Sequence, residues 1–133
     1  MYLIRVKDDF SAAHSLRWPD GSAEGLHGHN WLVEAVVACT GVDKSGIALD
    51  FTVVGNALHE LLGAELDHRN LNMLPGINEP NATSERIARW IFDRLDAALN
   101  LPPETAALDS VTVWETPSCG VTYQPAARGR TRR

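Results

Sequence analysis

Two histidines that lie two residues apart, His27 and His29, begin a segment whose apolar side chains alternate as in a β-strand. Because residues i and i+2 of a strand point to the same face, both imidazoles can reach a single metal ion. His14 lies thirteen residues before His27, in a strand-like segment of its own. Three neutral imidazoles that leave one coordination position open are typical of catalytic zinc sites. We therefore predict that His14, His27 and His29 bind Zn²⁺, whereas His59, which has no such partners in the pattern, is interpreted as a structural residue.

Two further groups have side chains suited to proton transfer or to substrate binding. Asp67 is followed directly by His68, and a carboxylate can fix the tautomer of a histidine that transfers protons. Asp-His pairs are also common without any function, so the spacing alone leaves both interpretations open. Glu115 lies near the end of a predicted strand, where its carboxylate can accept two hydrogen bonds from an amidine-like edge of a heterocycle. The alternative for Glu115 is a solvated charge at a strand end.

A small number of regular elements must hold these residues. Alternating polar and apolar residues predict strands, apolar residues at helical spacing predict helices, and clusters of Gly, Pro and Asn separate them. We expect strands over residues 2–15, 28–40, 110–116 and 120–124, a helix from the N-cap Thr52 to Gly63, and a helix from the N-cap Thr83 or Ser84 to Leu99. The residues between them, 16–26 and 66–72, are expected to form a loop and an irregular segment.

The resulting order, ββααββ, favours an α+β domain with one four-stranded antiparallel sheet and two helices packed on one face. The first two strands then form a hairpin that brings His14 alongside the other two histidines. A chain of 133 residues is long enough for one such domain and not for two. The helices leave the second face of the sheet uncovered, so we expect the protein to form oligomers.

Composition excludes several classes of protein. The net charge of −5 implies no general affinity for nucleic acid, and the arginines at the end of the chain are interpreted as a solvated tail. The two cysteines, Cys39 and Cys119, form no CxxC pair, which indicates a reducing compartment. The sequence has neither the apolar region of a signal peptide nor an apolar run of about 18 residues. We therefore expect a cytoplasmic protein without a membrane span.

Five motifs, in the same order along the chain, resemble those of the 6-pyruvoyltetrahydropterin synthase / 6-carboxytetrahydropterin synthase family. They are His14, His27-Gly28-His29, the segment from Leu66 to Asn72, the segment from Asn81 to Glu85, and Trp114-Glu115-Thr116. The resemblance covers residues 3 to about 124 and implies the tunnelling fold, in which such sheets trimerise into a barrel and two trimers stack as a hexamer. It also implies active sites at subunit interfaces. We accordingly expect one pterin-synthase-like domain, residues 1–125, and a basic, disordered tail, residues 126–133.

The same resemblance assigns roles to individual residues. It implies a zinc ion on the three histidines, a proton relay through Asp67 and His68, a pterin anchor at Glu115 and a weaker pterin contact at Thr83. The family's reaction begins with 7,8-dihydroneopterin triphosphate, whose side-chain hydroxyls bind zinc while a base removes a proton from carbon. The expected activity is that of a zinc-dependent lyase, which forms a 6-substituted pterin, either a tetrahydropterin or 6-hydroxymethyl-dihydropterin.

One position departs from the family pattern. The family's usual base is a cysteine four residues before the first histidine of HGH, and here that position is Ala23, which cannot take a proton. Glu24 follows it, and the spacing Glu-x-x-His-Gly-His resembles a subgroup in which a glutamate replaces the cysteine and the product is 6-hydroxymethyl-7,8-dihydropterin. A carboxylate near Zn²⁺ stays ionised and can act as a base, so Glu24 is the predicted base, with a water-facing loop carboxylate as the alternative. Without any replacement for the cysteine, the chain would be a pterin-binding homologue with a zinc site but no synthase activity. Cys119 lies close to Glu115 in sequence and is interpreted as a packing residue.

Overall fold

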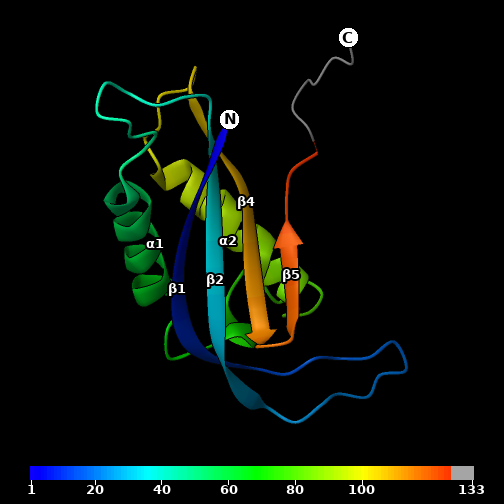
Figure 1. Ribbon diagram of the computed structural model, residues 1–133. Helices are drawn as coiled ribbons and strands as arrows, with labels where there is room; N and C mark the ends of the chain where they lie inside the picture. Colours follow the sequence, from blue (N-terminus) through cyan, green and yellow to red (C-terminus); the bar gives the residue numbers. More distant parts are fainter. Residues whose placement is uncertain (127–133) are drawn as a thin grey trace.

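The computed structural model describes residues 1–126, so all but the first residue of the predicted basic tail lies outside the described residues. Two long strands come first, and two helices and a hairpin follow (Figure 1). The elements are β1 (Tyr2–His14), β2 (His27–Cys39), α1 (Phe51–Glu65), β3 (Arg69–Asn70), the 3₁₀ helix η1 (Leu71–Met73), α2 (Ser84–Ala98), β4 (Ala106–Thr116) and β5 (Cys119–Tyr123). The predicted order is confirmed, with β3 and η1 added inside the segment that was expected to be irregular.

The five strands form one sheet in the order β3-β1-β2-β4-β5. β1 and β2 pair antiparallel over their whole length, from Tyr2 opposite Cys39 to His14 opposite His27. β4 and β5 continue the antiparallel pairing, whereas the two residues of β3 pair parallel with the end of β1. The α+β fold class is confirmed, and the sheet has one strand more than predicted because this short edge strand has no pattern of its own in the sequence.

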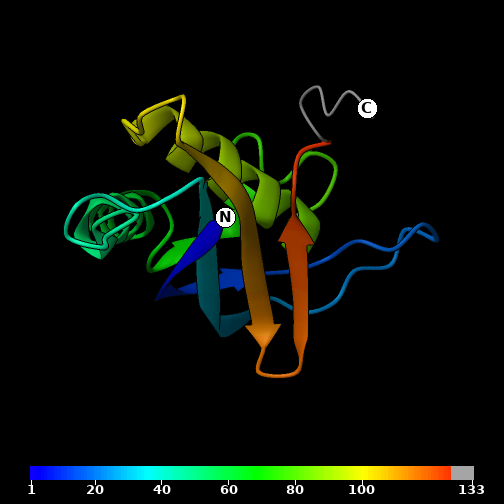
Figure 2. The same cartoon turned by 45° about the horizontal axis from the view of Figure 1, so that its top comes forward.

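Both helices lie on the same side of the sheet (Figures 1 and 2), α1 against β1 and α2 against β4 and β5. The first N-cap is Asp50 and not the predicted Thr52. The Asp50 carboxylate accepts a hydrogen bond from the Thr52 N–H at 2.9 Å, so the helix begins at Phe51. Of the two predicted caps of α2, Thr83 and Ser84, the structure has Thr83, because its hydroxyl accepts a hydrogen bond from the Arg86 N–H.

Alternation along the hairpin separates a core face from a face without helices. On β2, Trp31 and Val33 are fully buried, and His27 and His29 share their parity along the strand. On β1, His14 occupies the corresponding core-facing position and is also fully buried. The three histidine side chains therefore point into the layer between the sheet and the helices, at one end of the hairpin.

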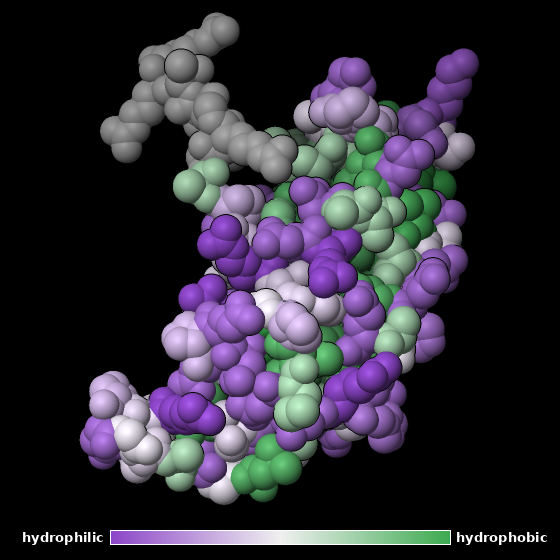
Figure 3. All heavy atoms as spheres, turned by 180° about the vertical axis from the view of Figure 1, so that it is seen from behind, coloured by the Kyte–Doolittle hydropathy of each residue, from purple (hydrophilic) through white to green (hydrophobic). Residues whose placement is uncertain are grey.

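The surface seen from behind is mostly hydrophilic, with hydrophobic side chains in separate patches (Figure 3). The loop of residues 15–26 extends from the body of the molecule beyond the paired ends of β1 and β2 (Figure 1). None of the helices in residues 1–126 has the length and apolar character that a membrane crossing requires.

Candidate metal centre and active site

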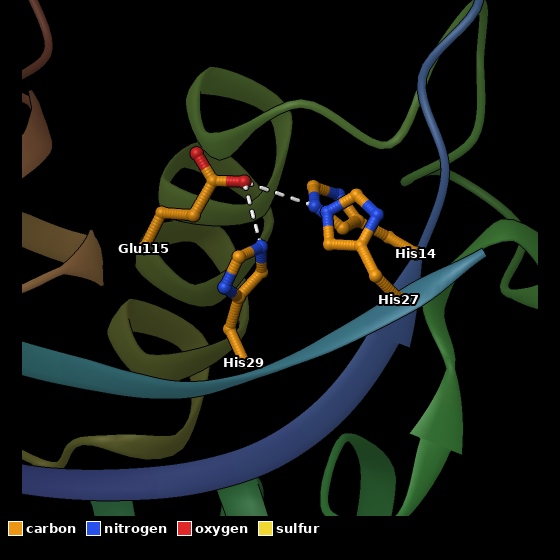
Figure 4. A group of neighbouring side chains, drawn as sticks. All are labelled: His14, His27, His29 and Glu115. Carbon is orange, nitrogen blue, oxygen red and sulfur yellow. Dashed lines mark ion pairs between the residues drawn. The ribbon is translucent and has the colours of Figure 1, made fainter. Parts of the chain in front are cut away.

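The three predicted metal ligands meet at the end of the β1–β2 hairpin. The ring centroids lie 4.8 Å apart for His14 and His27, 5.3 Å for His14 and His29, and 4.8 Å for His27 and His29. Figure 4 shows the imidazoles grouped around a common point. The indole of Trp31 forms the floor, with its ring 4.9 Å from that of His14 and 5.2 Å from that of His29. Its Nε1–H donates to the Ala12 carbonyl at 3.1 Å, which fixes this floor in the core.

Backbone carbonyls determine which ring nitrogen of two histidines is free to bind a metal. His14 Nδ1 lies 2.8 Å from the carbonyl oxygen of Ala82, and His27 Nδ1 lies 2.8 Å from that of Gly25. A carbonyl oxygen only accepts hydrogen bonds, so each Nδ1 carries a proton, and in the neutral form of each ring Nε2 has the free lone pair. Contacts of this kind orient metal-binding imidazoles in proteins.

A carboxylate from β4 completes the group. Glu115 Oε1 lies 2.9 Å from His14 Nε2 and 3.1 Å from His29 Nε2 (Figure 4). Together with His27, these residues offer four ligand atoms that all lie within 4.8 Å of one another. Zinc bonds of about 2.1 Å place tetrahedral ligand atoms roughly 3.4 Å apart. For all four atoms to bind one ion, the longest separations would have to shorten, and the 2.9 Å and 3.1 Å contacts of Glu115 would have to lengthen slightly.

Two buried nitrogens support a cation at this point. Among residues 1–126, His14 Nε2 and His29 Nε2 are the buried side-chain polar atoms without a hydrogen-bond partner. Each faces the Glu115 carboxylate, and two lone pairs that face each other repel unless a proton or a metal ion lies between them. Desolvation lowers the pKa of His29, although the nearby Glu115 carboxylate opposes this shift. Neutral imidazole is the form that binds metals, so these residues fit a zinc ion.

A β-bulge sets the position of Glu115. Across the β4–β5 ladder, Trp114 faces Gly120 and Thr116 faces Cys119, so Glu115 is an extra residue on β4. Bulges of this kind re-aim a side chain and increase the local twist. The indole of Trp114 lies over Gly120 so closely that a Cβ there would be 2.6 Å from Trp114 Cε3. Sequence patterns did not reveal that Glu115 lies beside the histidines, and its role as a pterin anchor stays a prediction.

The predicted base lies at the rim of the cluster. Glu24 Oε1 is 3.8 Å from His27 Nε2 and accepts a hydrogen bond from the Leu16 N–H at 3.1 Å. Its side chain is 31% exposed, so a substrate can reach the carboxylate. Ala23, at the position of the family's cysteine, pairs with Arg17 in an isolated antiparallel bridge. The structure thus places a carboxylate beside a predicted metal ligand, and the catalytic role of Glu24 stays a prediction.

Asp67 and His68 form a pair on the outer edge of β1. His68 Nδ1 lies 2.9 Å from Asp67 Oδ2, so the carboxylate can fix the tautomer of the ring. The Ser11 N–H donates to Asp67 Oδ1 at 2.9 Å and lowers the pKa of Asp67, with burial opposing and the His68 side chain adding a smaller decrease. His68, at a φ of 58°, donates its own N–H to the Ser11 carbonyl. Within residues 1–126 no hydrogen bond, ion pair or ring contact joins this pair to the three histidines.

Three other residues occupy simpler positions. The Thr83 hydroxyl caps α2, and a contact with pterin, which stays a prediction, would come in addition to this hydrogen bond. Cys119, interpreted from the sequence as a packing residue, is exposed because it lies at the tip of the β4–β5 hairpin. His59 Nδ1 lies 2.8 Å from Asp8 Oδ2, an ion pair that agrees with its interpretation as a structural residue.

Comparisons with known proteins assign the family. Residues 3–126 match the family model of 6-pyruvoyl tetrahydropterin synthase. The chain is 36% identical over 127 residues to 6-carboxy-5,6,7,8-tetrahydropterin synthase of Synechocystis sp., with 92% of this chain and 93% of that protein covered. It is 37% identical over 118 residues to dihydroneopterin monophosphate aldolase of Pyrococcus furiosus, with 89% of this chain and 93% of that protein covered. The structure of 6-pyruvoyl tetrahydropterin synthase from Caenorhabditis elegans matches with a TM-score of 0.78 and 27% identity, over 94% of this chain and 96% of that one. The family inferred from the motifs is confirmed: the chain is a lyase of the 6-pyruvoyl tetrahydropterin synthase family.

Proposed function

We propose that the protein is a zinc-dependent lyase that processes the side chain of 7,8-dihydroneopterin triphosphate, or of a closely related phosphate ester, and forms a 6-substituted pterin. The observation that carries this proposal is the convergence of three imidazoles and a carboxylate within 4.8 Å, with the Glu24 carboxylate at the rim. Three histidine nitrogens that leave one position open are typical of catalytic zinc, whereas structural sites use four protein ligands with cysteines prominent. Glu115, the fourth residue of the cluster, is proposed to bind the substrate and not the ion. Neither cysteine of the chain belongs to this cluster.

Each group at the site has a proposed task. A zinc ion held by His14, His27 and His29 would polarise the side-chain hydroxyls of the substrate and ease the loss of their protons. Glu24 is the proposed base: Oε1 already accepts the Leu16 N–H, which leaves Oε2 to take a proton. Glu115 is proposed to bind the amidine-like edge of the pterin, because its two oxygens can accept two parallel N–H donors.

The product that we propose is 6-hydroxymethyl-7,8-dihydropterin. Glu24 takes the proton of the 2′-hydroxyl, the C1′–C2′ bond breaks, and its electron pair moves into conjugation with the C6=N5 bond of the ring. A proton then returns to C1′, and the other two side-chain carbons leave as glycolaldehyde that still carries its phosphate ester. Two observations support this choice: Ala23 removes the usual cysteine, and the 37% identical Pyrococcus furiosus relative is named as a dihydroneopterin monophosphate aldolase.

Asp67 and His68 are proposed to relay protons in the site of a second copy of the chain. The His68 side chain is 83% exposed, and the pair is docked on the outer edge of β1, away from contact with its own cluster. β3 covers only the last part of that edge, and β5 forms the opposite edge of the sheet. Unpaired strand edges are templates for pairing with another chain. We infer a homo-oligomer with active sites at its subunit interfaces.

Product analysis tests the proposed function. The zinc-loaded protein is incubated with 7,8-dihydroneopterin triphosphate and, separately, with the monophosphate. We expect 6-hydroxymethyl-7,8-dihydropterin; a carboxy or pyruvoyl product would keep the lyase but overturn the proposed cleavage. Tight pterin binding without any product would favour the second candidate, a pterin-binding homologue without synthase activity, for which the absence of the cysteine at Ala23 is the supporting observation.

A further inference from the structure

Two asparagines of the motifs, Asn72 and Asn81, have no part in the reaction proposed above, yet both hold the backbone that follows His14. Asn72 Oδ1 accepts the Ser15 N–H at 2.7 Å, and Asn72 Nδ2 donates to the Ser15 carbonyl at 2.8 Å. Asn81 binds Arg17 with the same pair of hydrogen bonds: Asn81 Oδ1 accepts the Arg17 N–H at 3.0 Å, and Asn81 Nδ2 donates to the Arg17 carbonyl at 2.8 Å. Each carboxamide therefore pairs with one residue through both a donor and an acceptor, as a neighbouring strand would.

The opposite edge of this segment contacts the predicted base. Leu16 lies between the two clamped residues, and its N–H donates to Glu24 Oε1 at 3.1 Å. The Leu16 carbonyl accepts the Glu24 N–H at 3.0 Å. In an extended chain the N–H and C=O groups of successive residues point to opposite edges. When Ser15 and Arg17 face the asparagines, Leu16 must therefore face Glu24.

The asparagines are themselves fixed by the fold. Asn72 lies in η1, and its Nδ2 also donates to Asn78 Oδ1 at 2.9 Å. Asn81 comes directly before Ala82, whose carbonyl holds His14 Nδ1 at 2.8 Å. Two adjacent residues before α2 thus have related tasks. Ala82 orients the predicted metal ligand His14, and Asn81 holds Arg17 near the start of the loop.

We propose that Asn72 and Asn81 are positioning residues, which hold Ser15–Arg17 in an extended path and thereby keep the Glu24 carboxylate within 3.8 Å of His27. The proposal rests on the proposed role of Glu24 as the base. The loop of residues 15–26 extends away from the body of the molecule (Figure 1). The first residues of the loop, Ser15–Arg17, therefore need fixed partners. Misplacement of a catalytic group by about 1 Å can lower a rate by ~10²-fold.

Alanine variants of the two asparagines test the proposal in the zinc-loaded protein. For Asn72→Ala and for Asn81→Ala we expect kcat to fall at least about tenfold and KM to stay within about twofold, because the proposed pterin anchor, Glu115, lies on a separate element, β4. Zinc content should stay at the wild-type value, because the three histidine ligands come from β1 and β2. Trypsin should cleave each native variant after Arg17 at least about tenfold faster than it cleaves the wild-type protein, because the segment Ser15–Arg17 opens more often. Asn81→Asp keeps the acceptor for the Arg17 N–H and loses the donor, so its kcat should be intermediate.

The matched control is Asn56→Ala, an exposed asparagine on α1 that should change none of these values. Unchanged kcat in both alanine variants would overturn the proposal. Loss of zinc, or cleavage that is accelerated equally at all arginines, would also overturn it, because either result would indicate general unfolding.

Glu24→Ala separates this proposal from the proposed function. If Glu24→Ala keeps full turnover while the asparagine variants lose it, Asn72 and Asn81 do not act through Glu24, and the positioning proposal is overturned although the lyase stands. If the wild-type protein forms no product, the proposed function fails. The rate of trypsin cleavage after Arg17 is then the remaining test of the two asparagines. Faster cleavage in the variants then supports only the part of the proposal in which the asparagines hold Ser15–Arg17 in an extended path, and an unchanged rate overturns that part as well.

Discussion

Gly120→Ala should move Trp114 and, through it, the neighbouring Glu115. A Cβ at Gly120 would lie 2.6 Å from Trp114 Cε3 and 2.7 Å from Trp114 Cδ2, whereas ordinary contacts begin at 3.4 Å. The indole must therefore shift by about 0.8 Å, and overpacking of this kind costs about 1–3 kcal/mol of stability. Because Glu115 follows Trp114 within the bulge and contacts His14 at 2.9 Å, we also expect turnover to fall roughly tenfold or more.

Urea denaturation and steady-state kinetics measure both effects. Gly63→Ala is the matched control, because a Cβ there meets no atom within 4 Å and alanine in a helix is favoured over glycine by about 0.5–1 kcal/mol. In a Trp114→Leu background the ring that the new Cβ meets is gone, so Gly120→Ala should cost much less than it does alone. Wild-type stability and turnover in Gly120→Ala, or an equal cost in both backgrounds, would refute the claim that this cross-strand pair positions Glu115.

Three further predictions concern single side chains. The hydrogen bond from the Ser11 N–H lowers the pKa of Asp67. The ionised Asp67 carboxylate therefore contributes to the free energy of unfolding above the unfolded pKa of about 3.9. This contribution is lost as the pH falls through the lower folded pKa. Asp67→Ala should lower the melting temperature at about pH 7, and melts recorded down to about pH 3 should show this difference shrinking; a constant difference would contradict the assignment. Thr83→Ala should lower the free energy of unfolding by about 1 kcal/mol in urea, whereas Thr83→Ser should lose much less, because it retains the cap. Cys119→Ser should leave turnover unchanged in steady-state kinetics, since this exposed thiol has no task in the proposed reaction, and a large loss would point to it as a missing acid–base group.

Features that depend on local spacing could be predicted from the sequence. The two-residue period of β1 and β2 determines that His14, His27 and His29 share a face, and the hairpin register then places His14 opposite His27. The apolar stripe of α2 is equally local, and the position of its cap was predicted to within one residue, Thr83 or Ser84. These features required no knowledge of distant contacts.

Features that depend on pairing between distant segments could not be predicted in this way. The bulge at Glu115 exists only relative to β5, and β3 exists because the Asp67-His68 pair docks on the backbone of Ser11. Asp50 and Thr52 are both residue types that favour N-caps, so the sequence pattern alone did not distinguish them. The hydrogen bonds of Asn72 likewise became apparent only once the path of the loop was known.

The central claim is that Glu24 is the base of a zinc-dependent pterin lyase. The most direct test compares kcat and zinc content of Glu24→Ala with those of the wild-type protein on the same dihydroneopterin phosphate. Removal of a general base lowers rates by about 10²–10⁴-fold, and we predict a loss of this size with unchanged zinc content, because Glu24 lies outside the four-residue cluster. Turnover near the wild-type value, or a loss of zinc together with activity, would contradict the claim.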